Sequence, residues 1–294
     1  MFDLHMHTCH SDGSLSVMEL LKEAQKAGLK YISITDHNTV DAYNEIEDGL
    51  FSGKIITGIE IECNFDGCLI EVLGYGINIE KIKNNNIMKK YFPLSMKEYY
   101  IKKLNKYKTI CTDLGIKFSE NLQLKAGDIY ANRSLIRDLI KYPENELALK
   151  KLGITSNETA EDEFLNKQIY NDKSPFYDNY WFSKKPTLQD AVDIIKSAGG
   201  LVFLAHPFIF KIAGTELLEK LLPLRLLDGV ECVNRKHSVE QIDYLIDFCN
   251  RNNLLKSGGS DFHRPIEHTM GHGNSGTYPI GKNITGELIA IIDK

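Results

Sequence analysis

Two stretches of this 294-residue chain alternate short apolar segments with amphipathic ones, and this alternation restricts the possible folds more than any other feature. Tyr31–Thr35 is a β-branched run typical of a buried strand, whereas Ser16–Gly28 carries its apolar residues at helical spacing. The same alternation returns after Thr187. Alternating β and α units imply a parallel sheet with right-handed crossovers, and a chain of this length fits one α/β barrel with an insertion.

The expected strands are Phe2–Thr8, Tyr31–Thr35, Lys54–Cys63, Cys68–Gly76, Leu201–His206, Gly229–Asn234 and Leu254–Ser257. The helices expected among them are Ser16–Gly28, Thr39–Gly49, Leu188–Gly199, Glu216–Leu222 and Val239–Asn252. Between about residues 81 and 185 the chain is rich in Lys, Asn, Tyr and Leu, with helical periodicity and few strand signals. We therefore expect residues 1–80 and 186–294 to form the barrel and residues 81–185 to form a helical insertion or cap.

Charge and composition exclude several classes of function. A net charge of −5 and a pI near 6.0 argue against broad binding to duplex DNA, but they permit a nucleotide or a short single strand as ligand. We find no signal-peptide pattern and no apolar stretch long enough to span a membrane. The six cysteines form no CxxC pair, so we expect reduced cysteines in a cytoplasmic protein.

Histidines and carboxylates recur where the expected strands end. His5 and His7 form an H-x-H pair on the first strand, where residues two apart point to the same face. A lone histidine at a strand end is more often structural, but the combined pattern is far more specific for metal binding. The residues at strand ends or in the loops that follow are His5, His7, Asp12, Asp36, His37, Glu60, His206, Asp261 and His263.

Parallel barrels gather their functional groups on the face where the strands end. Imidazoles combined with carboxylates suit Zn²⁺, Mn²⁺ or Fe²⁺ better than Ca²⁺ or Mg²⁺ alone. The set exceeds what one ion needs, so we expect two or three divalent ions. Clustered ions of this kind bind an anionic ester and activate water, which predicts a metal-dependent phosphoester hydrolase.

Five segments resemble the sequential motifs of the PHP (polymerase and histidinol phosphatase) phosphoesterases, which belong to the amidohydrolase-like metal-dependent hydrolases. These segments are HMHTCHSDGS, SITDHN, GIEI, LAHP and GGSDFH. The resemblance covers both halves of the expected barrel and skips the insertion. The stretch Ile70–Gly76, together with Arg133, is most similar to the stand-alone 3′,5′-nucleotide phosphatases and short-RNA exonucleases of that family.

The resemblance implies a distorted (β/α)₇ barrel, TIM-like, with up to three metal positions. By this analogy, His5, His7, Glu60 and Asp261 hold the first ion. Glu60 bridges to a second ion, which His206 also binds, and Asp12, His37 and His263 hold the third. Asp36 orients a ligand or lies behind the ligands.

Two positions depart from the family pattern. Relatives usually carry histidine where this chain has Glu71; a carboxylate can ligate the same ion but changes the preferred metal. The alternative is that Glu71 is a solvent-facing strand residue. Relatives also tend to have R-P-H where this chain has Arg133, Ser134 and Leu135, and leucine can neither ligate nor donate a proton. The second departure puts the exact substrate of that subgroup in doubt.

Four basic side chains are candidates for contact with substrate phosphate. Arg133 could clamp a phosphate with two hydrogen bonds, or it could form a surface salt bridge. Arg235 and His237 follow a strand end and could contact phosphate, although His237 could simply precede the next helix. Lys173 could reach the site from the insertion.

The predicted reaction is in-line attack on the phosphorus of a phosphomonoester or terminal phosphodiester by a metal-bound hydroxide. Asp261 is counted with the catalytic residues, and His206 or His263 could assist proton transfer. Three alternatives stay open. They are hydrolysis of an amide or lactone on the same scaffold, hydrolysis of histidinol phosphate or another small phosphoester, and a degenerate, non-catalytic metal-binding module.

Overall fold

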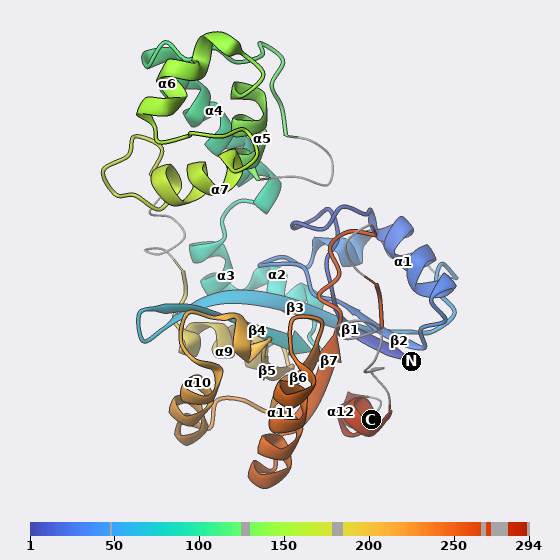
Figure 1. Ribbon diagram of the computed structural model, residues 1–294. Coiled ribbons are helices and arrows are strands. Elements are labelled where there is room, and N and C mark those ends of the chain that lie inside the picture. The colour runs from blue at the N-terminus through green and yellow to red at the C-terminus, as the bar shows by residue number, and fades with distance from the viewer. Residues whose placement is uncertain (48, 125–129, 178–184, 266–268, 272–281, 293–294) are drawn as a thin grey trace. The chain divides into compact units, whose positions relative to one another are not determined.

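The computed structural model describes residues 1–47, 49–124, 130–177, 185–265, 269–271 and 282–292 (Figure 1). The chain divides into two compact units. Met1–Pro93 and Lys185–Lys294 form the first unit, and Leu94–Lys184 forms the second. The short helices α2 (Ile79–Asn84) and α3 (Asn86–Tyr91) belong to the first unit and lie against α9 (Leu188–Ser197).

The first unit is built on a seven-stranded sheet whose strands follow one another in chain order. The strands are β1 (Phe2–Met6), β2 (Tyr31–Ile34), β3 (Lys54–Phe65), β4 (Cys68–Tyr75), β5 (Leu201–Leu204), β6 (Gly229–Asn234) and β7 (Leu255–Gly259). A parallel bridge between Met6 and Phe262 brings the last segment of the sheet back beside the first strand. The sheet therefore closes almost completely, and the predicted distorted seven-stranded barrel is confirmed.

The expectation of an all-parallel sheet is wrong at β4, which runs antiparallel to both β3 and β5. Phe65 pairs with Cys68, so only Asp66 and Gly67 connect β3 to β4. Both residues have left-handed backbones, with φ of 53° and 77°. This is the geometry of a two-residue hairpin turn, for which Asp-Gly is a preferred sequence, and such a turn joins only antiparallel strands.

Helices cover the outside of the barrel. α1 (Val17–Lys26), α9 and α11 (Val239–Asn252) each begin with a capping box, in which Ser16, Thr187 and Ser238 are the N-cap residues. α10 (Gly214–Leu221) and α12 (Lys282–Ile292) complete the set. None of the described helices combines the length and the apolar character needed to cross a bilayer.

The helix expected at residues 39–49 is reduced to a 3₁₀ turn, Asp41–Glu45, in the described part of that segment. Tyr43 explains why the chain stays close to the sheet here. Its hydroxyl donates to the carbonyls of Ile34 and Ile56 at 2.7 and 3.2 Å, and it accepts from the Gly58 N–H at 2.7 Å. These bonds hold the segment against β2 and β3.

Apolar and acidic side chains share one face of the strands. Ile56, Leu73, Phe203 and Val233 belong to one buried cluster, which also includes residues of α12. Glu60 and Glu71 lie an even number of residues from Ile56 and Leu73, so they point to that same face. Apolar and acidic side chains therefore share this face of the sheet.

Helices joined by turns and loops make up the second unit over its described residues, 94–124 and 130–177. Its helices are α4 (Met96–Asp113), α5 (Ala131–Leu139), α6 (Glu146–Lys151) and α7 (Ala160–Phe164). They pack around a core of their own that includes Tyr100, Tyr107, Leu135, Phe164 and Phe176.

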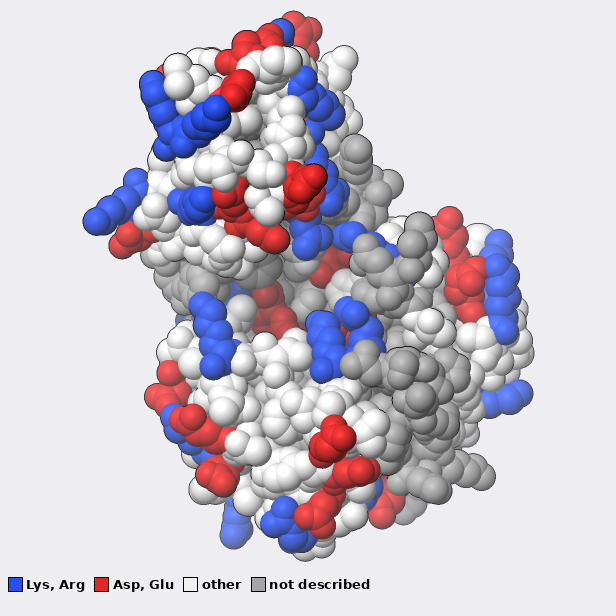
Figure 2. Space-filling model, viewed as in Figure 1, with Lys and Arg blue, Asp and Glu red and all other residues white. Residues whose placement is uncertain are grey.

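Charged side chains of both signs are intermixed over the face shown in Figure 2, where the described Lys and Arg residues stand singly or in small groups beside acidic ones. No broad basic surface of described residues is visible on that face.

Candidate metal centre

Buried Glu60 lies at the centre of the histidine cluster. Its Oε2 atom is 3.2 Å from His5 Nε2, 3.3 Å from His7 Nε2 and 3.2 Å from His37 Nδ1. Among the described residues, that oxygen has no hydrogen-bond partner although it is fully buried. A buried carboxylate oxygen without a hydrogen bond destabilises the folded protein unless a cation binds it. The three ring nitrogens around this oxygen are potential ligands of the same cation.

His5 and His7 come from the end of β1 and the residue after it, as the H-x-H pattern predicts. Their Nε2 atoms are 3.1 Å apart, and Asp261 Oδ1 lies 3.7 and 3.3 Å from them, respectively. Gly259 allows this approach, because a Cβ atom there would lie 2.1 Å from His5 Cβ. The end of β7 at Gly259 therefore packs in close contact with β1 at His5.

His206 and Asp261 both follow strands and both have positive φ angles, 20° and 53°. Non-glycine residues rarely adopt this region, and such strain is concentrated at functional sites. The strained turn directs His206 Nε2 to within 3.1 Å of Glu60 Oε1, on the opposite oxygen from the one that His5 and His7 approach.

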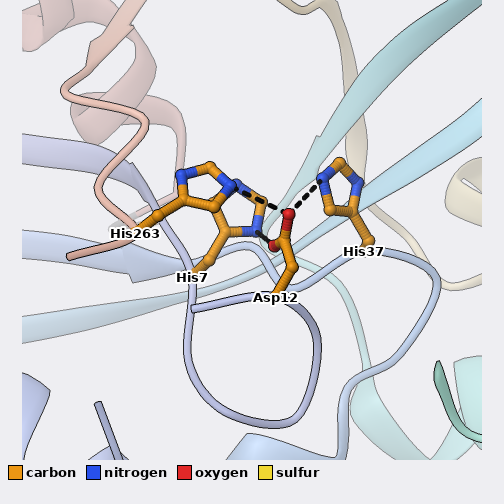
Figure 3. A group of neighbouring side chains, drawn as sticks. All are labelled: His7, Asp12, His37 and His263. Atoms are coloured by element: carbon orange, nitrogen blue, oxygen red, sulfur yellow. Dashed lines mark hydrogen bonds and ion pairs between the residues drawn. The ribbon is translucent and has the colours of Figure 1, made fainter. Parts of the chain in front are cut away.

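A second set of ligand atoms surrounds Asp12 (Figure 3). Asp12 Oδ2 is 3.1 Å from His263 Nε2 and 3.9 Å from His37 Nε2, and Asp12 Oδ1 is 3.6 Å from His7 Nδ1. The loop that carries Asp12 passes close to β1: a Cβ on Gly13 would lie 2.3 Å from the His7 carbonyl oxygen.

Glu71 points from β4 toward the same cluster. Its Oε2 is 3.4 Å from His206 Nε2, its Oε1 is 3.9 Å from His37 Nδ1, and its side chain is 17 % exposed. This placement argues against the alternative of a solvent-facing strand residue.

Asp36 binds the loop that leads from His7 to Asp12 through its carboxylate oxygens. It accepts from the Thr8 N–H at 2.7 Å, from Thr8 Oγ1 at 2.5 Å and from Ser11 Oγ at 2.5 Å. The sequence places Asp36 beside His37, and its role in the structure is to fix the backbone that leads to Asp12.

Glu231 is a buried residue of this site that the sequence analysis missed. Its Oε1 lies 2.9 Å from His5 Nδ1, while its Oε2 accepts from the His206 N–H at 2.8 Å and from Asn234 Nδ2 at 3.2 Å. One carboxylate thus braces two of the histidines. The available signal was an acidic residue inside the otherwise apolar strand Gly229–Val233.

The electrostatics of the cluster favour positive charge at His37 but not at His7, whose pKa burial and the neighbouring His263 lower. Burial works against the charged forms of His37, yet Glu60 and Asp12 outweigh burial and raise the pKa of His37 to about 10. Burial likewise opposes ionisation of Glu60, but His5 and His37 hold the pKa of Glu60 well below its usual value. Burial and the neighbouring Glu60 raise the pKa of Glu71 to about 7.

These side chains fit divalent cations. Four groups of three or four residues each bring their ligand atoms within 4.8 Å of one another: His7, Asp12, His37 and His263; His5, His7 and Asp261; His5, His206 and Glu231; and His37, Glu60 and Glu71. Imidazole nitrogens and carboxylate oxygens in this mixture are typical ligands of Zn²⁺, Mn²⁺ and Fe²⁺.

The residues predicted to contact phosphate do not all lie beside the metal-ligand candidates. Arg235 lies beside the cluster, with Nη2 3.9 Å from Asp261 Oδ2 and Nε donating to the Asp261 carbonyl at 3.4 Å. Lys236, which the sequence analysis passed over, is nearer still, with Nζ 2.8 Å from Asp261 Oδ2. His237 is fully buried with Nδ1 3.1 Å from the Cys232 carbonyl, which supports its alternative role before α11.

Arg133 and Lys173 belong to the second unit. The Arg133 guanidinium lies over the Tyr130 ring at 4.9 Å and is 3.9 Å from Glu161, as in the surface salt bridge considered for it. Lys173 lies in a turn, where its N–H donates to Asn171 Oδ1. Leu135 is fully buried in the apolar core of that unit, so its side chain serves packing there. His268 and His272 lie outside the described residues.

Comparison with known proteins identifies the family. The family model for the PHP domain matches residues 3–163, more than half of the chain, and the chain therefore belongs to the PHP domain family. It is 25 % identical to a 5′-3′ exoribonuclease of Haemophilus influenzae, over 96 % of this chain and 94 % of that protein. It is 24 % identical to a 3′,5′-nucleoside bisphosphate phosphatase of Chromobacterium violaceum, over 99 % and 97 % of the two chains.

The fold comparison agrees. A solved structure of an amidohydrolase from Chromobacterium violaceum superposes with a TM-score of 0.66 and 18 % identity, covering 99 % of this chain and 96 % of that one. The family and the barrel predicted from the motifs are thus confirmed. So is the predicted class of enzyme, a metal-dependent phosphoesterase.

Proposed function

We propose that this protein hydrolyses phosphomonoester or terminal phosphodiester bonds of nucleotides or short single-stranded oligonucleotides. The observation that carries the proposal is buried Glu60, whose Oε2 has three imidazole nitrogens at 3.2–3.3 Å and no hydrogen bond among the described residues. A carboxylate shared by two cations would satisfy both of its oxygens. The names of the two relatives, a nucleotide phosphatase and an exoribonuclease, support the class of substrate.

The proposed ligands divide into three positions around Glu60. The geometry supports His5, His7, Glu60 and Asp261 at the first, and Glu60, Glu71 and His206 at the second. Asp12, His37 and His263 form the third. Zn²⁺, Mn²⁺ and Fe²⁺ are the candidate ions.

Divalent ions held by these ligands supply two things, a lowered pKa for bound water and neutralisation of charge on the phosphate oxygens. The chain itself supplies the rest. Arg235 and Lys236 place two cations beside Asp261, where they can orient an incoming phosphate. His206 and His263 are the proposed proton-transfer groups, and Asp36 keeps the Asp12 loop in register with them.

The test is a substrate panel with protein reconstituted separately with Zn²⁺, Mn²⁺ and Fe²⁺. Nucleotides phosphorylated at the 3′ position, the 5′ position or both, short oligoribonucleotides, histidinol phosphate, and amide and lactone substrates are compared. We expect turnover of the nucleotide or oligonucleotide substrates and its loss in Asp261→Asn. Turnover of amides or lactones alone, or none by fully metal-loaded protein, contradicts the proposal.

The phosphate contacts are tested with the same panel. Arg235→Ala, Arg133→Ala, Lys173→Ala and His237→Ala are each expected to raise KM more than they lower kcat if the residue binds substrate. His237→Ala is the variant whose effect on thermal stability must be measured alongside, because that side chain is buried.

We also propose that the protein works in the cytoplasm. The six cysteines, all of them among the described residues, form no disulfide, and four of them are buried, which fits a reducing compartment.

A further inference from the structure

Three carboxylates converge in the middle of the β3–β4 hairpin. Glu60 and Glu62 are two residues apart on β3 and so point to the same face, and Glu71 pairs directly with Glu62 across the hairpin. Glu60 and Glu62 are buried, and Glu71 is mostly so. Like charges in directly opposed positions destabilise a sheet, so each of these carboxylates requires a compensating partner.

Glu62 obtains its partners from the protein. Its Oε2 forms a short ion pair with Lys185 Nζ, in which both side chains are 4 % exposed, and it accepts from Asn38 Nδ2 at 2.6 Å. Asn38 Oδ1 also accepts from the Glu62 N–H at 3.1 Å. A buried lysine and an amide thus account for this carboxylate.

The charged partners of Glu71 differ from those of Glu62. Among the described residues the Glu71 carboxylate has no lysine or arginine partner, and its charged neighbours at ion-pair distance are His206 at 3.4 Å and His37 at 3.9 Å. Both of these rings also approach Glu60, at 3.1 and 3.2 Å. Two carboxylates and two imidazoles therefore face one another without a fixed cation of the protein between them.

The ligand chemistry of this position differs from that of its neighbours. The group around Asp12 offers three imidazoles and one carboxylate, and the first position, with Glu60 counted, offers two imidazoles and two carboxylates. The Glu71 position combines the carboxylates of Glu60 and Glu71 with the single imidazole of His206, so carboxylate oxygens form a larger share of its ligand atoms. Oxygen-rich sites suit Mn²⁺, whereas imidazole-rich sites suit Zn²⁺.

We infer that Glu71 is a metal ligand that makes the position shared by Glu60, Glu71 and His206 selective for Mn²⁺ relative to the imidazole-rich positions beside it. This inference rests on the proposed function, because it assigns the metal of the same site. Zn²⁺ binds more tightly than Mn²⁺ to most protein ligand sets, so the selectivity is expressed as the Mn²⁺-to-Zn²⁺ affinity ratio.

The test measures binding without reference to activity. Chelator-treated wild type, Glu71→Gln and Glu71→His are titrated with Mn²⁺, followed by the electron paramagnetic resonance signal of free Mn²⁺, and with Zn²⁺ against a chromogenic chelator. Elemental analysis after desalting counts the bound ions.

We expect Glu71→Gln to lose Mn²⁺ affinity at one position by at least about tenfold, the lower end of the loss seen when a supporting group is removed from a metal site. Relative to Glu71→Gln, Glu71→His should bind Zn²⁺ more tightly at this position but should not regain Mn²⁺ affinity.

Two further variants separate the possible outcomes. Glu45→Gln removes the carboxylate of an exposed histidine–glutamate pair, His10 with Glu45 at 2.9 Å, and should leave binding unchanged. Asp261→Asn should weaken the first position. If Asp261→Asn loses metal while Glu71→Gln and Glu71→His bind Mn²⁺ and Zn²⁺ as wild type does, the inference about Glu71 is wrong and the proposed function stands. If Asp261→Asn also binds as wild type does, the metal centre itself is wrong.

Discussion

Replacing Glu231 with glutamine changes a single atom of a buried carboxylate, and the structure predicts a large effect on metal binding. A carboxylate only accepts hydrogen bonds, so Glu231 Oε1 at 2.9 Å from His5 Nδ1 requires the proton to be on Nδ1. The lone pair of His5 is then on Nε2, which faces His7, Glu60 and Asp261. Glu231 thereby selects the ring tautomer that can bind an ion.

Glutamine fails in either orientation of its amide. If the amide nitrogen faces His5, it opposes the Nδ1 proton or moves that proton to Nε2, where it blocks the ligand. If the amide oxygen faces His5, the amide nitrogen meets two donors, the His206 N–H at 2.8 Å and Asn234 Nδ2 at 3.2 Å. At least one buried donor loses its acceptor, at a cost of about 1–3 kcal/mol.

We therefore expect Glu231→Gln to bind Zn²⁺ about 10- to 100-fold more weakly than wild type, the range found when a hydrogen-bond partner of a ligating histidine is lost. The measurement is a competition titration of metal-free protein against a chromogenic chelator, with circular dichroism to verify the fold.

Asp138→Asn is the matched control, because Asp138 is another buried carboxylate with hydrogen-bond donors, but it lies in the second unit. It accepts from Ser119 N–H at 2.7 Å, from Ser119 Oγ at 2.6 Å and from Lys141 Nζ at 3.0 Å. Asp138→Asn should lower the thermal midpoint without changing metal affinity. Zn²⁺ affinity of Glu231→Gln within about twofold of wild type would refute the argument from the histidine tautomer.

Three other predictions follow from the same cluster. Gly259→Ala should destabilise the barrel and lower metal affinity together, because the new Cβ would lie 2.1 Å from His5 Cβ; a thermal midpoint equal to that of wild type would contradict this. Metal-free protein should lose stability as the pH rises from 7 to 9.5. The pKa of His37 is raised to about 10 in the folded protein, from about 6.5 in the unfolded chain, so its contribution to stability is complete below pH 6.5 and is lost as the pH approaches 10. Urea unfolding in the presence of chelator at pH 7 and pH 9.5 tests this, and an equal or higher urea midpoint at pH 9.5 would count against it. Saturating divalent metal, at about 100 times its dissociation constant, should add about 2.7 kcal/mol to the free energy of unfolding, and an unchanged urea midpoint on metal addition would exclude binding to the native state.

Much of the local structure was predictable because local sequence decides it. The capping residues Ser16, Thr187 and Ser238 mark helix starts through hydrogen bonds that span three residues, and the strands follow from β-branched and apolar runs. The Asp66–Gly67 turn was equally local, so the antiparallel β4 could have been predicted from this pair.

The ligand candidates were predictable for a related reason. Side chains at the ends of successive strands meet when the sheet curls into a barrel, so the motifs that carry His5, His37, Glu60, His206 and Asp261 indicated their neighbourhood in advance. The motifs did not indicate what surrounds these residues. Glu231 and His5 are 226 positions apart, and only the register of β6 against its neighbours brings them to 2.9 Å.

The sequence alone determined most of the helices and strands, their order and the chemistry of the site, because each depends on residue type and short spacing. Tertiary structure alone decided that Glu231 braces two histidines, that Glu62 is neutralised by Lys185 whereas Glu71 faces imidazoles, and that His237 and Leu135 are buried. These features depend on strand register and side-chain packing between distant segments. No local interaction encodes them, because the partners become neighbours only once the barrel closes and the helical unit packs its own core.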